Sequence, residues 1–223
     1  MASLFISRSL AEDSPVRAWC TANEVSLVDQ SLVHFSQPDR IVWPDEHFDW
    51  VFFYSPRGVE YFFDQYPHEW SDFQFACFGH GTAEALRAKD IHAAFVGNGE
   101  FRQVADDFAE VATGQSVLFP QARNSRRTVS RHIGDRILAT EVVVYENEAR
   151  PVEFEQSFKY LLFTSPMNVM AFLEKNFIDP FTHVLAIGAT TEAALINRGI
   201  EEPLVAGSPS EEALVEVLKT RTD

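Results

Sequence analysis

Residues 51–62 read Val-Phe-Phe-Tyr-Ser-Pro-Arg-Gly-Val-Glu-Tyr-Phe, and residues 161–172 read Leu-Leu-Phe-Thr-Ser-Pro-Met-Asn-Val-Met-Ala-Phe. The second stretch lies 110 positions after the first, and both predict a strand, a Ser-Pro pair and a helix in that order. Another match follows at an offset of 109, between Gly-His-Gly-Thr-Ala-Glu-Ala-Leu at 79–86 and Gly-Ala-Thr-Thr-Glu-Ala-Ala-Leu at 188–195. Two motifs that recur in the same order, at a period too long for a solenoid, indicate a duplicated domain.

The same alternation of strand and helix continues along the chain. Short apolar or aromatic runs alternate with amphipathic stretches that open on Ser or Thr, which is typical of β-α-β units with a parallel sheet. The expected fold class is therefore α/β. Strands are predicted at residues 3–7, 25–33, 49–54, 74–78, 92–96, 116–120, 137–145, 159–164, 183–187 and 203–206.

The number of elements predicts how the two copies divide the chain. The first copy has five strands and four helices, whereas the second lacks about one strand-helix-strand piece. The N-terminus supplies such a piece, which is too small to be stable alone. We therefore predict a discontinuous domain of residues 1–33 and 153–223, an inserted domain of residues 42–145, and Pro-containing linkers at 34–41 and 146–152.

Composition excludes several classes of function. The 18 basic and 33 acidic side chains give a net charge of −15, which argues against nucleic acid or an anionic membrane as a partner. Cys20 and Cys77 lie far apart, outside the spacing of a zinc ribbon, a redox dithiol or a disulfide scaffold. No run of about 18 apolar residues is present for a spanning helix. We expect a cytoplasmic protein.

Metal and nucleotide chemistry have little support in the sequence. His80, His132 and His183 lack metal-ligand spacing, and no H-E-x-x-H motif or carboxylate cluster occurs, so we expect no metal. The Gly-x-Gly at residues 79–81 lacks the third glycine and the later acidic residue of a dinucleotide fingerprint. No G-x-S-x-G elbow of a serine hydrolase is present either.

Candidate binding groups follow the predicted strands. Ser55-Pro56 and Ser165-Pro166 suit helix capping, which alone would explain both pairs. The same positions would also present helix N-termini, with their free N–H groups, to an anion. Gly-x-x-Thr follows two other predicted strands and offers close backbone approach and a hydroxyl, at Gly79, Thr82, Gly188, Thr190 and Thr191.

Two further features each leave two interpretations open. The arginines at 123, 126, 127 and 131, together with Arg8, are either a solvated surface or a positive lip at the carboxyl edge of the sheet. Residues 208–211, Ser-Pro-Ser-Glu, form a capping box with Pro209 at the first helical position, which predicts a packing helix with a possible ligand contact.

In the order of its motifs, the chain resembles the uroporphyrinogen-III synthase family over nearly its whole length. The likeness rests on short segments that are individually weak but specific in their order, spacing and duplication: residues 4–8, 49–56, 75–82, 117–120, 144–145, 162–165 and 186–191. The resemblance implies two similar parallel-sheet α/β domains joined by a two-stranded linker, with the N-terminal strand and helix packed into the C-terminal domain.

The resemblance also implies an activity without a cofactor. Hydroxymethylbilane, a linear tetrapyrrole with eight carboxylates, would lose its terminal hydroxyl, invert its last pyrrole ring and close to uroporphyrinogen III. Tyr145 matches the family tyrosine and would donate a proton to the leaving hydroxyl, although it could instead simply fill the cleft between the lobes. Substrate carboxylates would be held around Arg8, Ser55, Pro56, Gly79, Thr82, Arg123, Ser165, Pro166, Gly188, Thr190 and Thr191.

Other expectations concern partners and departures from the family. No heptad pattern argues for more than a monomer. The resemblance implies a small-molecule partner, the linear tetrapyrrole, and a transient contact with the preceding enzyme of the pathway. Gln121-Ala122-Arg123 replaces the usual Pro-Arg-Gly turn after Pro120, which puts the contribution of that loop in question. A non-catalytic two-lobed module that binds a small polyanion would share these features, whereas a sugar- or nucleotide-handling enzyme is disfavoured because its phosphate loop and acid-base pair are missing.

Overall fold

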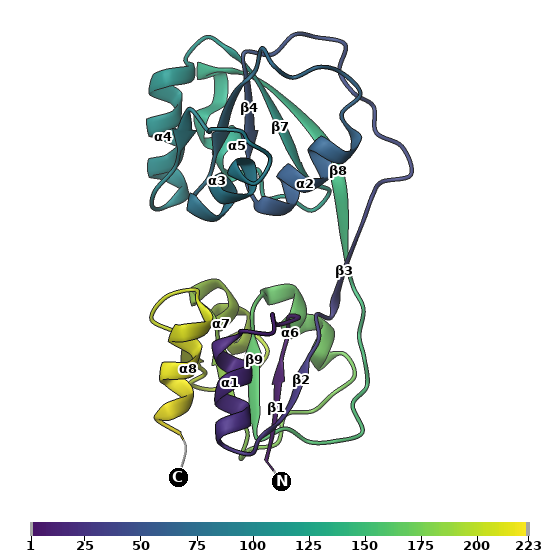
Figure 1. Ribbon diagram of the computed structural model, residues 1–223, viewed down its shortest axis with the longest axis vertical. Coiled ribbons are helices and arrows are strands. Elements are labelled where there is room, and N and C mark those ends of the chain that lie inside the picture. The colour runs from purple at the N-terminus through teal and green to yellow at the C-terminus, as the bar shows by residue number, and fades with distance from the viewer. Residues whose placement is uncertain (1, 222–223) are drawn as a thin grey trace. The chain divides into compact units, whose positions relative to one another are not determined.

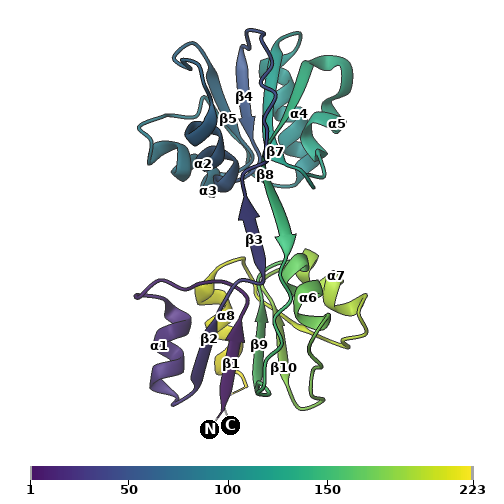
Figure 2. The same cartoon turned by 90° about the vertical axis from the view of Figure 1, so that its right-hand side faces the viewer.

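The computed structural model describes residues 2–221, which form two compact units (Figures 1 and 2). Unit 1 comprises the chain up to His34 and from Glu148 onward, and unit 2 comprises Phe35–Asn147. Residue 1 and residues 222–223 of the predicted discontinuous domain lie outside the described residues. Within residues 2–221, no helix has the length and apolar character needed to span a membrane.

Unit 1 is a parallel sheet with two helices on each face. Its strands are β1 (Ser3–Ile6), β2 (Ser26–Asp29), β9 (Tyr160–Phe163), β10 (His183–Ala186) and β11 (Leu204–Val205), in the order β11-β10-β9-β1-β2. Helices α1 (Pro15–Ala22) and α8 (Glu211–Lys219) cover one face. Helices α6 (Pro166–Leu173) and α7 (Ala189–Ile196) cover the other (Figure 2).

Unit 2 has the same three layers. Its strands are β3 (Val33–Ser36), β4 (Trp50–Phe53), β5 (Gln74–Cys77), β6 (Phe95–Val96), β7 (Ser116–Ala122) and β8 (Leu138–Ala149), in the order β3-β8-β7-β4-β5-β6. Helices α2 (Pro56–Gln65) and α3 (His80–Arg87) pack on one face. Helices α4 (Phe101–Ala112) and α5 (Thr128–Ile133), followed by a 3-10 turn at Gly134–Arg136, pack on the other.

Five of the six strands in the unit 2 sheet repeat the strand order of the unit 1 sheet, and β3 has no counterpart among the described residues of unit 1. The order β11-β10-β9-β1-β2 in unit 1 corresponds to β6-β5-β4-β7-β8 in unit 2, so the N-terminal strand β1 takes the place that β7 holds in the other sheet. Strand β1 pairs with β9 in parallel, as β7 pairs with β4. The α/β class, and the packing of the N-terminal strand and helix into the sheet of the C-terminal segment, are confirmed.

The structure corrects two local predictions. The strand predicted at 25–33 is two strands, β2 and β3, in different sheets, because the chain turns away after Asp29 and the N–H of Leu32 donates to the side chain of Asn168 (2.7 Å). Ser210, rather than Ser208, caps α8, since its hydroxyl accepts from the N–H of Ala213 (3.2 Å), and Pro209 lies before the cap.

Strands β3 and β8, neighbours in their sheet, extend into the segments predicted as linkers.

Candidate functional site

The predicted binding residues lie at the carboxyl ends of parallel strands, where helices begin. We call these edges the unit 1 rim (residues 7–8, 164–168 and 187–191) and the unit 2 rim (residues 54–58, 78–82, 120–123 and 145). In a parallel α/β sheet this edge gathers helix N-termini, whose first N–H groups have no partner within the helix. Both rims are therefore suited to anions.

The two Ser-Pro pairs begin α2 and α6 in the same way. Ser55 Oγ accepts from the N–H of Gly58 at 3.2 Å, and Ser165 Oγ accepts from the N–H of Asn168 at 3.3 Å. Pro56 and Pro166 stand in the first turn, where no N–H is needed. The capping interpretation of both pairs is therefore correct. It does not exclude a ligand, because one hydroxyl satisfies only part of a helix N-terminus.

The two Gly-x-x-Thr motifs leave more of their helix N-termini open. Gly79 and Gly188 are extended residues that cap α3 and α7 through their carbonyl groups alone, which accept from the N–H groups of Thr82 and Thr191, each at 3.0 Å. Both threonine side chains are buried, whereas Thr190 is exposed. The first two N–H groups of α3 and the first two of α7 make no hydrogen bond within residues 2–221. They are the least committed donors on the rims.

Tyr145 reaches the N-terminus of α2. The residue is 8% exposed, its ring stacks on Tyr61 with centroids 5.3 Å apart, and its hydroxyl lies 3.2 Å from Ser55 Oγ, where either oxygen can donate. The structure thus brings two predicted site residues together. A second phenol on this rim, Tyr54, is already engaged, because its oxygen accepts from the N–H of Ser130 (3.1 Å) and burial raises its pKa.

Two of the four arginines predicted to form a positive lip on unit 2 are neutralised by carboxylates. The side chain of Arg123 forms an ion pair with Glu146, and its backbone N–H donates to the carbonyl of Tyr145 (3.0 Å). Arg127 pairs with Glu141 at 2.9 Å. Part of the predicted positive lip is therefore a set of ion pairs between β8 and the segment that follows β7, whereas Arg126 and Arg131 form no ion pair within residues 2–221.

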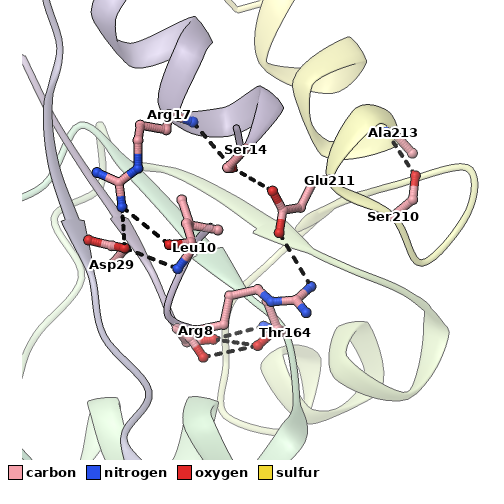
Figure 3. Close-up of polar contacts among 10 residues, drawn as sticks. Arg8, Leu10, Ser14, Arg17, Asp29, Thr164, Ser210, Glu211 and Ala213 are labelled. Atoms are coloured by element: carbon pink, nitrogen blue, oxygen red, sulfur yellow. Dashed lines mark hydrogen bonds and ion pairs between the residues drawn. The ribbon is translucent and has the colours of Figure 1, made fainter. Parts of the chain in front are cut away.

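On the unit 1 rim, Arg8 sits beside the junction of β1 and β9 (Figure 3). Ser7 Oγ accepts from the N–H of Thr164 at 2.8 Å, and Thr164 Oγ1 donates to the carbonyl of Ser7 at 3.0 Å. These bonds fix the ends of the two strands, so Arg8 and Ser165 emerge at the same edge. Arg8 forms an ion pair with Glu211, Nη1 to Oε1, at 3.8 Å.

This geometry can be compared with known proteins. A family model described as "Uroporphyrinogen-III synthase HemD" matches residues 31–216. The chain belongs to this family. The uroporphyrinogen-III synthetase of Helicobacter pylori 26695 superposes with a TM-score of 0.76 at 19% identity, covering 100% of both chains. A mutant uroporphyrinogen III synthase from the extremely thermophilic bacterium Thermus thermophilus gives 0.63 at 12% identity, covering 99% of this chain and 98% of that one.

These structural likenesses show the fold. No curated protein matches the chain. As a uroporphyrinogen-III synthase family member, the chain is placed in the context of tetrapyrrole biosynthesis.

One rim residue of this family member was missed by sequence reasoning. Gln121 is 2% exposed, and neither its amide nitrogen nor its amide oxygen has a hydrogen-bond partner among the described residues. Val117 lies opposite Trp50, and Leu4 lies opposite Tyr160, the equivalent of Trp50 in the repeat. Counting four residues on makes Gln121 the unit 2 counterpart of Arg8. The sequence repeats did not include β1 and β7, so this equivalence appears only in the sheet register.

The rims are distinct from a cavity at the other edge of unit 1. That cavity of about 520 Å³ lies at the amino ends of β10 and β11. Its lining includes Asp179, His183, Glu201, Glu202 and Arg221. In open parallel α/β sheets ligands bind at the carboxyl edge, which is the edge of the rims and not of this cavity. Within residues 2–221, no group of three His, Cys, Asp or Glu side chains could hold a metal ion.

Proposed function

We propose that the protein is a uroporphyrinogen-III synthase that cyclises hydroxymethylbilane, with inversion of the terminal pyrrole ring and loss of water. Membership of the family supports the reaction class. The observation that carries the proposal is the position of Tyr145, whose hydroxyl lies 3.2 Å from the serine that begins α2, at a rim of uncommitted N–H groups. A proton donor thus stands among carboxylate-binding donors.

The proposed reaction needs one proton donor. Tyr145 gives its hydroxyl proton to the leaving hydroxyl of hydroxymethylbilane, which departs as water. A phenolic hydroxyl carries one proton that it can donate. The terminal pyrrole inverts through a spiro intermediate, and the proton lost as the ring closes restores the phenol. The net change is the loss of one water, and no cofactor takes part.

The substrate carboxylates would be held chiefly by backbone N–H groups. The open N–H groups that begin α3 and α7 can each donate to a carboxylate oxygen, and the helix dipole favours the same charge. Preorganised donors of this kind replace water without requiring many arginines. The net charge of −15 is therefore compatible with binding an eightfold anion, because local donors determine the field at a rim.

The test is the identity of the product. Purified protein is supplied with enzymatically made hydroxymethylbilane, the products are oxidised, and isomers I and III are resolved. The proposal predicts predominantly isomer III. Exclusive formation of isomer I, the spontaneous product, would overturn it, and binding without turnover would identify a non-catalytic polyanion-binding module instead.

A further inference from the structure

A carboxylate from α8 stands between two helix N-termini, next to Arg8 (Figure 3). Glu211 is the first residue of α8, and its Oε2 accepts from the hydroxyl of Ser14 at 2.5 Å. Ser14 in turn caps α1, where its Oγ accepts from the N–H of Arg17 (3.4 Å). The Glu211 side chain is 19% exposed. It is held by the hydroxyl and by the positive end of its own helix.

Arg8 is oriented by this carboxylate, yet its donors stay free. Nη1 of Arg8 lies 3.8 Å from Oε1 of Glu211, which is an ion-pair distance but too long for a hydrogen bond. Among the described residues, the Arg8 side chain makes no hydrogen bond, and it is 44% exposed. Its rigid fork of five N–H donors is therefore available at the unit 1 rim.

A neighbouring ion pair shows the contrast. Arg17 Nη2 donates to Asp29 Oδ2 at 2.7 Å, and the same oxygen accepts from the N–H of Leu10 at 3.0 Å. Arg17 also donates to two carbonyl groups of the loop between β1 and α1, so its donors are used in holding that loop. Arg17 is thus a structural arginine, whereas Arg8 has its donors available.

We propose that Glu211 is a positioning residue that holds the guanidinium of Arg8 at the unit 1 rim, where its open N–H groups bind one carboxylate of the substrate. The inference rests on the proposed function and adds a specific substrate contact to it. Ser14 and the N-terminus of α8 partly compensate the charge of Glu211, which lessens its repulsion of an incoming carboxylate.

The test measures kcat and KM for hydroxymethylbilane in Glu211→Gln, Arg8→Met and the double variant. In Glu211→Gln the new amide oxygen can still accept from the hydroxyl of Ser14, and only the charge that faces Arg8 is lost. KM should rise about fivefold with kcat little changed, a size suited to a partly exposed ion pair.

The double variant shows whether Glu211 acts through Arg8. If it does, Glu211→Gln has no further effect on KM once Arg8→Met is present, because the two changes remove one interaction. Asp29→Asn is the matched control, since it neutralises the carboxylate of the neighbouring structural pair and should leave KM unchanged. Melting temperatures of all variants separate loss of fold from loss of binding.

Each outcome decides the inference. An unchanged KM in Glu211→Gln, a lowered KM, or independent effects of the two substitutions would overturn it while leaving the proposed function intact. If Glu211→Gln does not fold, Arg8→Lys takes its place, because it keeps the charge but loses the fork and should also raise KM. A wild-type protein that yields only isomer I would overturn the proposed function, and this inference with it.

Discussion

At the scale of single residues, Tyr145 combines a packing contact with the chemical role that we propose for it. Its ring stacks on Tyr61, whereas its hydroxyl meets Ser55 at the start of α2. Tyr145→Phe keeps the ring and removes only the proton donor. We expect kcat to fall roughly ten- to a hundredfold, at or below the low end of general acid catalysis, because solvent can also protonate a leaving hydroxyl.

Tyr61→Phe is the matched control for this prediction. It deletes the same kind of hydroxyl from the other ring of the stack, and we expect kcat to stay close to that of the wild type. An equal loss in both variants would show that the effect arises from packing. A thousandfold loss in Tyr145→Phe would point to a covalent role that the account does not include.

The buried amide of Gln121 leads us to expect that an apolar substitution at this position stabilises the protein. Burying an amide without partners costs free energy that an apolar side chain of similar size avoids. Gln121→Leu should raise the free energy of unfolding by about 1 kcal/mol, measured by urea denaturation.

For Gln115→Leu, in the same unit, we expect the opposite effect, a lower free energy of unfolding. Gln115 Oε1 accepts from the indole N–H of the buried Trp50 at 2.5 Å, so its removal leaves that N–H unpaired. We expect a loss of about 1–2 kcal/mol. If Gln121→Leu destabilises the protein as Gln115→Leu does, the Gln121 amide is satisfied in the folded protein and its assignment here is wrong.

At the scale of elements, close packing of α4 against the end of β6 requires a glycine. A Cβ at Gly97 would lie 2.5 Å from the carbonyl oxygen of Phe78 and 2.6 Å from Val104 Cγ1. Gly97→Ala must therefore displace backbone or α4, and we expect a loss of about 2 kcal/mol in the free energy of unfolding.

Gly81→Ala provides the comparison. No atom lies within 4 Å of a Cβ at this position in α3, so the substitution should stabilise the protein by about 0.5–1 kcal/mol through helix propensity. Thermal unfolding of both variants tests the packing account. Equal tolerance of alanine at both positions would contradict it.

The amino ends of β4 and β7 are joined by a contact that depends on pH. The backbone N–H and the hydroxyl of Ser116 both donate to Asp49 Oδ2, at 2.8 and 2.7 Å, and lower the pKa of Asp49 below its ordinary value of 3.8. A carboxyl whose pKa is lowered on folding stabilises the protein above the pKa of the unfolded state. This contribution disappears as the pH falls through the lower pKa of the folded state.

Asp49→Asn should therefore melt below the wild type at pH 7. The difference between the melting temperatures of the variant and the wild type should narrow as the pH falls through 3.8 and below, because the wild-type carboxyl then becomes protonated. Melting temperatures across this range provide the measurement. A gap that stays constant with pH would show that the charge of Asp49 contributes nothing.

At the scale of the whole molecule, most of the fold could be predicted from local sequence patterns. The repeated Ser-Pro and Gly-x-x-Thr motifs predicted the capped helices of both units, since capping depends on residues three positions apart. The split of residues 25–33 into β2 and β3 could not be predicted, because an apolar run does not reveal that its two halves join different sheets.

The candidate site was predictable in part, for the same reason. The strand ends that carry Ser55, Ser165 and the two glycines follow from local patterns. The contact of Glu211 with Arg8 joins the two ends of the chain, and the equivalence of Gln121 with Arg8 follows only from strand register. Neither the contact nor the equivalence can be recognised from a local sequence pattern.

The central claim, that uncommitted N–H groups on both rims hold the substrate carboxylates, is tested most directly by amide ¹H–¹⁵N NMR spectra. The probe is uroporphyrin III, the octacarboxylate obtained by oxidising the proposed product. Chemical-shift changes are expected at the N–H groups that begin α3 and α7. Changes confined to the residues around the cavity at the amino ends of β10 and β11, or no changes at the rims, would contradict it.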